Sequence, residues 1–283
     1  MRLVSASALT KRVGEMTAVD DVSLSVNRGE VVDFLGPNGA GKSTTMMMIA
    51  GFLERDAGTA AICGHDVWQD PVGAKARLGY LPAGAPAYGD MPVADFLKFC
   101  GRMRGLRRRR QNDRLAEMVE RVEVQEVWSR PVDALSKGFR RRVAIAQALL
   151  HDPDVLILDE PTDGLDPNQK HHMRALIRAI APEKAIIVST HILEEVEAVC
   201  SRAVIIARGK VVADAEPQEL MEKAAGGRAI RVTVAEAEEA RAIEQLRRHT
   251  GGAEIEVMDH ENGTARVLVR VGDRPVDAAD LAG

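Results

Sequence analysis

Residues able to carry out phosphate chemistry stand together near the start of the chain. Residues 36–44, Gly-Pro-Asn-Gly-Ala-Gly-Lys-Ser-Thr, fit a phosphate loop of Gly, four residues and Gly-Lys-Ser/Thr. The glycines let backbone N–H groups close on phosphate, and the start of the next helix adds a favourable dipole. Lys42 is placed to reach the β- and γ-phosphates of a nucleoside triphosphate, and the Ser43 hydroxyl to ligate Mg²⁺. The predicted nucleotide contacts are Gly36, Pro37, Asn38, Gly39, Ala40, Gly41, Lys42, Ser43 and Thr44.

The segments on either side of this loop are those that a phosphate site needs. Residues 31–35, Val-Val-Asp-Phe-Leu, are an apolar run with the length of a buried strand. Residues 44–50 can continue as a helix that meets Gly51. The alternative, a glycine-rich loop with a chance Lys-Ser pair, does not require a strand before it and a helix after it. The context therefore favours a nucleoside triphosphate site.

Three more polar side chains follow predicted strands at their carboxyl ends. Asp159 and Glu160 come directly after the apolar run 155–158, and His191 follows the run 185–188. Because ligands bind at the carboxyl ends of parallel strands, we expect these residues and Gly36 at one edge of a sheet. Each has a plainer explanation: a turn after a strand for the two carboxylates, and an ordinary polar residue for His191.

A second helix start is another candidate phosphate contact. Ser136 precedes a helix predicted over residues 140–150, where it is a suitable N-cap, and Gly138 stands beside it. The N-terminus of that helix would face a phosphate group. The alternative is that Ser136 only caps the helix.

The order of the predicted elements indicates an α/β fold. Strands that alternate with helices imply a mostly parallel sheet covered on both faces. The alternating residues 22–26, a turn and the strand 31–35 imply an antiparallel layer at the start of the chain.

Two domains are expected. The first is a nucleotide-binding domain over residues 1–224, with a charged helical subdomain at about 84–150. Glycines at 226 and 227 mark a linker. A small α+β appendage follows at 228–283, and its tail from residue 276 is predicted as a helix that is cut off early.

Composition narrows the class of protein. The 283 residues carry a net charge of -4 and the pI is about 6.0, so overall charge does not indicate a nucleic-acid partner. The sequence has no apolar run of about 18 residues, and its start is too polar for a signal peptide. Cys63, Cys100 and Cys200 form no metal-binding spacing, which favours a reduced, cytosolic setting.

Arginine is concentrated between residues 102 and 114, where four are consecutive at 107–110. The plain interpretation is a solvated connection between helices. The sharper interpretation is a patch that faces anionic lipid or a partner. Since no aromatic residue stands among these arginines, a nucleic-acid surface is disfavoured.

Residues 2–222 together resemble the ATP-binding cassette family, the nucleotide-binding subunits of membrane transporters. Residues 135–139, Leu-Ser-Lys-Gly-Phe, look like its signature motif, and residues 155–160 look like its Walker B strand. Residues 164–166, Gly-Leu-Asp, resemble the D-loop, and His191 resembles the switch histidine. The appendage is similar to that of bacterial export-type cassettes whose membrane subunit is a separate chain.

The resemblance implies a catalytic role for each matched residue. Lys42 and His191 would contact the γ-phosphate, and Glu160 would orient or polarise the attacking water. Ser43 and Asp159 would hold Mg²⁺, the latter through water. The implied reaction is ATP hydrolysis.

The resemblance also implies partners. Ser136, Gly138 and Asp166 would meet the nucleotide of a second subunit, identical or paralogous, so that ATP closes a head-to-tail dimer. The dimer would lie at the cytoplasmic face of the membrane, on a separate transmembrane permease, with no nucleic acid.

Three positions depart from the family pattern or from ordinary strand composition. Val13 stands where the family has an aromatic residue that stacks on adenine, a loss of about 1–2 kcal/mol or roughly tenfold in affinity. Ala83 stands where the family has Gln or Glu near Mg²⁺, so we expect impaired coupling or slow turnover. Asp33 places a charge inside a strand, either at a wet position or at a cost to the core.

Three functions remain open at this stage. The first is an ATPase that powers an exporter. The second is a regulatory module that closes on ATP but turns it over poorly, which Val13 and Ala83 would suit. The third is a cassette ATPase acting on nucleic acid, but the long coiled-coil insertion or second cassette typical of that class is missing from this sequence.

Overall fold

The chain forms two compact units, Met1–Pro217 and Gln218–Gly283. The computed structural model describes residues 1–84, 87–190, 199–220, 228–235, 239–250, 254–261 and 264–271. In this part of the chain no helix combines the length and the apolar composition that crossing a membrane requires.

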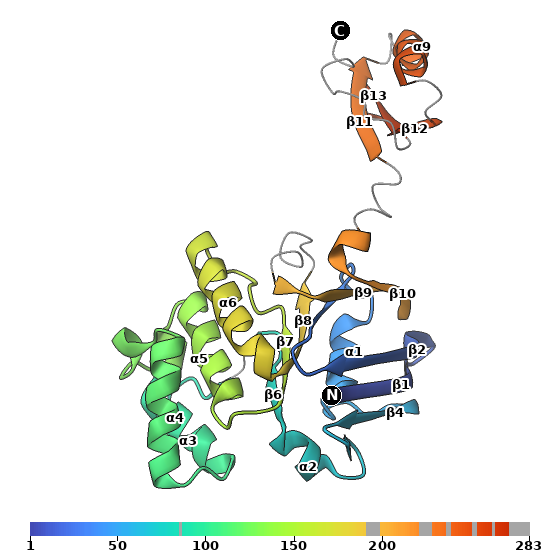
Figure 1. The fold of residues 1–283 in the computed structure, drawn as a ribbon. Helices are drawn as coiled ribbons and strands as arrows, with labels where there is room; N and C mark the ends of the chain where they lie inside the picture. The colour runs from blue at the N-terminus through green and yellow to red at the C-terminus, as the bar shows by residue number, and fades with distance from the viewer. Residues whose placement is uncertain are drawn as a thin grey trace. The chain divides into compact units, whose positions relative to one another are not determined.

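The first unit is built on a six-stranded sheet with the order β10-β9-β3-β8-β7-β6 (Figure 1). Only β9 and β10 pair antiparallel, as a hairpin; the other neighbours are parallel. The predicted α/β fold with a mostly parallel sheet is therefore confirmed. The strands are β3 (Val31–Leu35), β6 (Leu78–Leu81), β7 (Val155–Asp159), β8 (Ala185–Thr190), β9 (Arg202–Ala207) and β10 (Lys210–Ala215).

A second, antiparallel sheet has the order β2-β1-β4-β5, which confirms an antiparallel layer at the start of the chain, but β3 belongs to the central sheet, where it pairs with β8 and β9 rather than with β2. The antiparallel sheet is larger than predicted, because the alternating residues 22–26 are only the second half of β2. Register shifts in β1 break its two-residue alternation, so the pattern alone did not reveal that strand. The strands are β1 (Arg2–Val13), β2 (Met16–Asn27), β4 (Ala57–Ile62) and β5 (His65–Asp66).

The two faces of the central sheet belong to different cores. Leu156 and Leu158 of β7 pack with helices α3 to α6, while Val155 and Ile157 pack with α1 and the antiparallel sheet. Figure 1 shows these two layers on opposite sides of the sheet. The helices are α1 (Lys42–Ile49), α2 (Pro71–Ala76), α3 (Val93–Met103), α4 (Arg108–Arg121), α5 (Lys137–Leu149) and α6 (Pro167–Ile180).

The second unit is a small α+β structure, as predicted. Its strands β11 (Arg228–Ala235), β12 (Glu254–Glu261) and β13 (Thr264–Val271) form an antiparallel sheet with β13 in the centre. Helix α9 (Glu239–Thr250) contributes Leu246 to a core with two valines of β13. Ala235 still pairs with Thr264 at the end of β11, before α9 begins. The tail predicted as a helix from residue 276 lies outside the described residues.

A histidine lies among buried groups just after α5. His151 Nε2 donates a hydrogen bond to the carbonyl oxygen of Leu78 at 3.0 Å. Burial, and then the charge of Arg104, lowers the pKa of His151 to about 4. The imidazole is therefore neutral in the folded chain at neutral pH, with its proton on Nε2.

We expect His151→Gln to flatten the loss of stability in acid. Because the unfolded chain takes up a proton near pH 6.5 and the folded chain only near pH 4, the free energy of unfolding falls as pH falls between these values. The contribution of His151 to this fall in the free energy of unfolding is roughly 2–3 kcal/mol. Urea unfolding at pH 7 and pH 4.5 measures it, with His171→Gln on the exposed face of α6 as control. An unchanged pH slope in His151→Gln would contradict the assignment.

Candidate functional site

The phosphate loop joins β3 to α1, and close backbone contacts hold it. A Cβ at Gly36 would lie 2.2 Å from the carbonyl oxygen of Ile206, and one at Gly41 would lie 2.6 Å from that of Ala18. Gly41 is also the N-cap of α1 and has a left-handed φ of 105°. Glycine is required at both places because no side chain fits between the loop and its neighbours.

Lys42 lies inside the loop. It is only 6% exposed, and its Nζ donates to the carbonyl oxygens of Gly36 at 2.6 Å and Pro37 at 3.0 Å. Ser43 is exposed at the helix start, where the first turn carries no acidic residue. The helix dipole of α1 and the charge of Lys42 would therefore both attract an anion at the phosphate loop.

The two carboxylates after β7 differ in environment. Asp159 is 2% exposed, whereas Glu160 is half-buried and has a left-handed φ of 49°. Ser189 of β8 joins them: its Oγ donates to Asp159 Oδ1 at 2.5 Å and accepts from the Glu160 backbone N–H at 3.0 Å. Asp159 pairs in register with Ser189, a signal that is available only when the order of strands is known.

A buried cation on α5 interacts with the charges of these carboxylates. Arg141 is 4% exposed. Burial lowers the pKa of Arg141, and the charges of Asp163, Glu160 and Asp159 oppose that shift. No sequence motif marked Arg141 as a site residue, because its position depends on how α5 packs.

The sheet order brings the predicted groups to one edge. Strand β8 lies between β3 and β7, so the phosphate loop and Asp159 stand on either side of Ser189. Ser43 and Asp159 offer a hydroxyl and a carboxylate, the hard oxygen donors that Mg²⁺ takes together with phosphate oxygens and water. The described residues contain no cluster of three or more His, Cys, Asp or Glu that would bind a metal without such phosphates. His191 lies outside the described residues.

The residues resembling the signature motif contact a different part of the chain. Ser136 is the N-cap of α5 and accepts from the Phe139 N–H at 3.3 Å. Lys137 Nζ pairs with Asp163 at 2.8 Å, and a Cβ at Gly138 would lie 2.3 Å from Gln169 Oε1. Asp166 caps α6. No hydrogen bond within the described residues joins Ser136 or Gly138 to the phosphate loop.

The positions that depart from the expected pattern differ in exposure. Val13 ends β1, is 58% exposed and pairs across the hairpin with Met16, which is also exposed. Ala83 is exposed after β6. Asp33 is fully buried, so the wet position considered for it is wrong.

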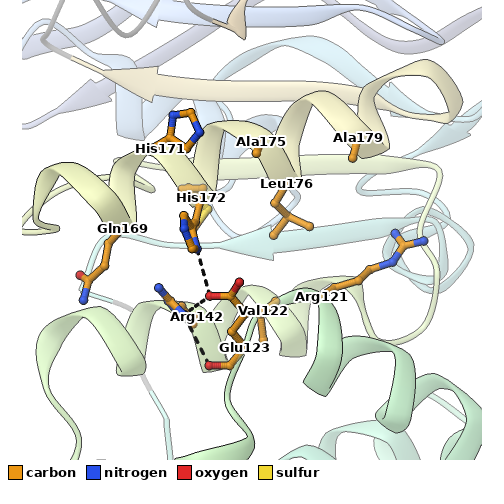
Figure 2. Close-up of a pocket in the computed structure, with 11 residues that line it drawn as sticks. Arg121, Val122, Glu123, Arg142, Gln169, His171, His172, Ala175, Leu176 and Ala179 are labelled. Carbon is orange, nitrogen blue, oxygen red and sulfur yellow. Dashed lines mark hydrogen bonds and ion pairs between the residues drawn. The ribbon is translucent and has the colours of Figure 1, made fainter.

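A cavity of about 580 Å³ lies between α4, α5 and α6, away from the phosphate loop. In it Glu123 accepts from His172 Nδ1 and Arg142 Nη1, each at 2.9 Å (Figure 2). The bond to His172 is the largest of the effects that lower the pKa of Glu123. Neither the phosphate loop nor the Asp159–Glu160 pair lines this cavity.

We expect Ser189→Ala to lower ATP turnover roughly tenfold and the free energy of unfolding by about 1–2 kcal/mol. The reason is that Asp159 and the Glu160 N–H lose the hydroxyl that fixes them. Ser201→Ala is the control, because in the described part of the chain the Ser201 hydroxyl bonds to the backbone of Val31 and to no carboxylate. Phosphate release measures the effect on turnover, and urea unfolding measures the effect on stability. Equal turnover in the two variants would exclude a positioning role for Ser189.

The sequence of the chain is similar to those of known proteins. The model of the family described as ABC transporter matches residues 19–163, which include the phosphate loop, Ser136 and the Asp159–Glu160 pair. Nod factor export ATP-binding protein I of Ralstonia nicotianae is 39% identical over 220 residues, covering 77% of this chain and 68% of that protein.

Solved structures agree with the fold. A structure described as the ATP binding subunit of an ABC transporter has a TM-score of 0.73 and 29% identity, covering 78% of this chain and 92% of that one. A dimeric bacterial ABC transporter cassette, MJ0796, has a TM-score of 0.70 and 21% identity, covering 76% of this chain and 99% of that one. The chain therefore belongs to the ATP-binding cassette family, as an ATP-binding subunit of an ABC transporter.

Proposed function

We propose that this subunit hydrolyses ATP to power export through a separate membrane permease. The observation that carries the proposal is the meeting of the phosphate loop and the Asp159–Glu160 pair on the two sides of β8. A fixed cation, a buried carboxylate and a half-buried carboxylate at one sheet edge suit phosphoryl transfer to water, which depends mainly on positioning and charge neutralisation.

The proposed roles follow from exposure and contacts. Lys42, held inside the loop, neutralises the phosphates, and Glu160, which is half-buried, orients the attacking water. Asp159 and Ser43 hold Mg²⁺, which when bound supplies positive charge to the phosphate oxygens. We keep His191 as the proposed γ-phosphate contact.

We further propose that a second subunit completes the site. Helix α5 covers the face of the central sheet opposite α1, and Lys137 and Gly138 contact residues 163–169. Ser136, Gly138 and Asp166 are therefore proposed to contact the nucleotide of a partner copy or paralogue. The dimeric cassette of the same fold supports this arrangement.

The export direction and the permease are proposals that rest on the relative named for Nod factor export. Such a subunit would work at the cytoplasmic face of the membrane. We propose residues 1–224 as the cassette domain, with its helical subdomain at about 84–150, and residues 228–283 as an accessory domain.

Two exposed side chains favour a second candidate, a regulatory module with weak turnover. Val13 offers an aliphatic surface where base stacking is expected, and Ala83 has no polar atom to report nucleotide state. Neither changes the phosphate end of the site. We therefore expect a weaker hold on the base and either weaker coupling or slow turnover, with ATP binding retained.

Glu160→Gln separates the two candidates. We expect it to lower steady-state phosphate release roughly 10²-fold or more, because the carboxylate that acts on water is lost. Glu183→Gln removes the same charge at the exposed turn before β8 and should leave the rate unchanged. Equal rates for the wild type and Glu160→Gln would favour the regulatory module.

Ala83→Gln tests the proposed weakness in coupling. We expect it to raise permease-coupled ATP turnover several-fold, while thermal stability stays the same because residue 83 is exposed. Ala83→Met, of similar length but without the amide, should have no such effect. ATPase rate and transport in vesicles that contain the permease are the measurements. An unchanged rate and unchanged transport in Ala83→Gln would show that Ala83 does not limit coupling.

A further inference from the structure

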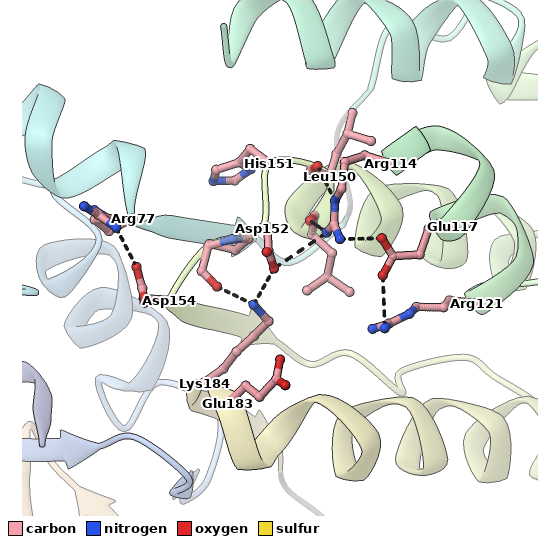
Figure 3. Close-up of polar contacts among 12 residues, drawn as sticks. Arg77, Arg114, Glu117, Arg121, Leu150, His151, Asp152, Asp154, Glu183 and Lys184 are labelled. Atoms are coloured by element: carbon pink, nitrogen blue, oxygen red, sulfur yellow. Dashed lines mark hydrogen bonds and ion pairs between the residues drawn. The ribbon is translucent and has the colours of Figure 1, made fainter. Parts of the chain in front are cut away.

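The arginines of α4 fall into two groups, and the first is satisfied by the protein itself. Arg114 pairs with Glu117 at 2.5 Å and donates to the carbonyl oxygens of Leu149 and Leu150. Arg121 pairs with the other oxygen of Glu117 at 3.0 Å. Figure 3 shows both guanidinium groups directed at these partners.

The second group, Arg107 and Arg110 at the start of α4, lines a pocket of about 320 Å³ together with Arg104 at the C-cap of α3; we call this pocket the arginine pocket. Three guanidinium groups and no carboxylate line it. Within the described residues, none of the three arginines forms an ion pair, and only Arg104 has a protein acceptor, the Lys75 carbonyl oxygen at 2.6 Å. The lining residues are Ala76, Arg104, Gly105, Leu106, Arg107, Arg110 and His151.

Part of this arrangement opposes stability. Burial lowers the pKa of Arg104, because it disfavours the charged form, whereas the position of Arg104 at the C-cap of α3 favours a cation. Arg107 is the N-cap of α4, with no side-chain cap and no acidic residue in the first turn. Cations at a helix N-terminus are unfavourable, because the helix dipole is positive there. Arg107 and Arg110 are three residues apart, so they share one face of the helix.

The pocket is also independent of the nucleotide site. Ala76 precedes β6 and His151 precedes β7, so the pocket lies at the amino ends of these strands. The phosphate loop and Asp159 lie at the carboxyl ends of β3 and β7. Ligand binding at the two places can therefore be measured separately.

We propose that the arginine pocket binds a compact phosphate group, supplied by an anionic lipid headgroup or by a soluble phosphate. Guanidinium groups bind phosphate through paired, charge-assisted hydrogen bonds, and the free N–H groups at the start of α4 add to the same field. The volume is at the lower end of the range for ligand cavities, which suits a small anion.

Two features of the rim favour a lipid as the source. Arg102, Arg108 and Arg109 are neighbours of the pocket residues in sequence and are exposed, as Arg107 and Arg110 are, so they add positive charge to the same region. Met103 stands among them and is 71% exposed, an apolar side chain that can enter a headgroup layer. An acidic protein segment would spread its carboxylates along a surface, whereas here the cations converge on one cavity.

The experiment compares two double variants of the full chain. Arg107→Gln/Arg110→Gln removes two charges from the pocket, and Arg108→Gln/Arg109→Gln removes two charges from the same turn outside it. Inorganic pyrophosphate is titrated calorimetrically, with excess ADP and Mg²⁺ so that the phosphate loop is occupied. Sedimentation with phosphatidylcholine vesicles, with and without phosphatidic acid, tests the lipid source. Thermal unfolding and ATP hydrolysis confirm folding and should be retained in both variants.

We expect the pocket variant to lose roughly tenfold or more in affinity and the control variant about twofold at most. Loss confined to vesicles identifies a lipid headgroup, and loss confined to pyrophosphate identifies a soluble phosphate. Equal losses in the two variants would show diffuse surface charge and overturn the proposal. Absence of binding in both assays would overturn it as well.

Discussion

Close backbone contact around the phosphate loop is the constraint on which the site depends. Gly36 and Gly41 leave no room for a Cβ, because backbone carbonyl oxygens of β9 and β2 stand beside them. The Gly209 N–H also bonds to the Ala40 carbonyl oxygen at 2.9 Å. The loop is thereby held against both sheets, and Lys42 and the start of α1 are aimed from a rigid support. Rigid placement matters because charges already in position need no reorganisation as the reaction proceeds.

The sheet order turns this loop into part of a larger site. With β8 between β3 and β7, one hydroxyl, that of Ser189, can bond to Asp159 and to the Glu160 backbone at once. Burial separates the two carboxylates by environment, and the left-handed backbone of Glu160 turns the chain just after the strand. Two adjacent acidic residues can therefore take the different tasks proposed for them. Arg141, buried on α5, adds positive charge beside both.

Outside the nucleotide site, the arginines differ in whether the protein supplies them with an ion-pair partner. Arg114 and the cavity cluster of Arg142, Glu123 and His172 are paired within the protein, and they hold helices together. The arginines of the arginine pocket form no ion pair within the described residues, and Arg107 and Arg110 stand at a helix end that disfavours cations. The paired charges contribute to stability, whereas the arginines of the pocket are proposed to bind an external phosphate. At the nucleotide site, Val13 and Ala83 depart from the family pattern. The residues proposed to contact the phosphates do not.

The sequence by itself determined the α/β fold, the phosphate loop, the cap at Ser136 and the Asp159–Glu160 strand end, because each depends on local spacing of apolar, glycine and polar residues. It missed β1, whose register shifts interrupt the alternation, and left the position of Asp33 open. Only the tertiary structure decided that Ser189 bridges the carboxylates, that Arg141 interacts with their charges and that three arginines share a pocket. These contacts join residues that are distant in sequence, and strand order and helix packing, which local patterns do not encode, bring them together.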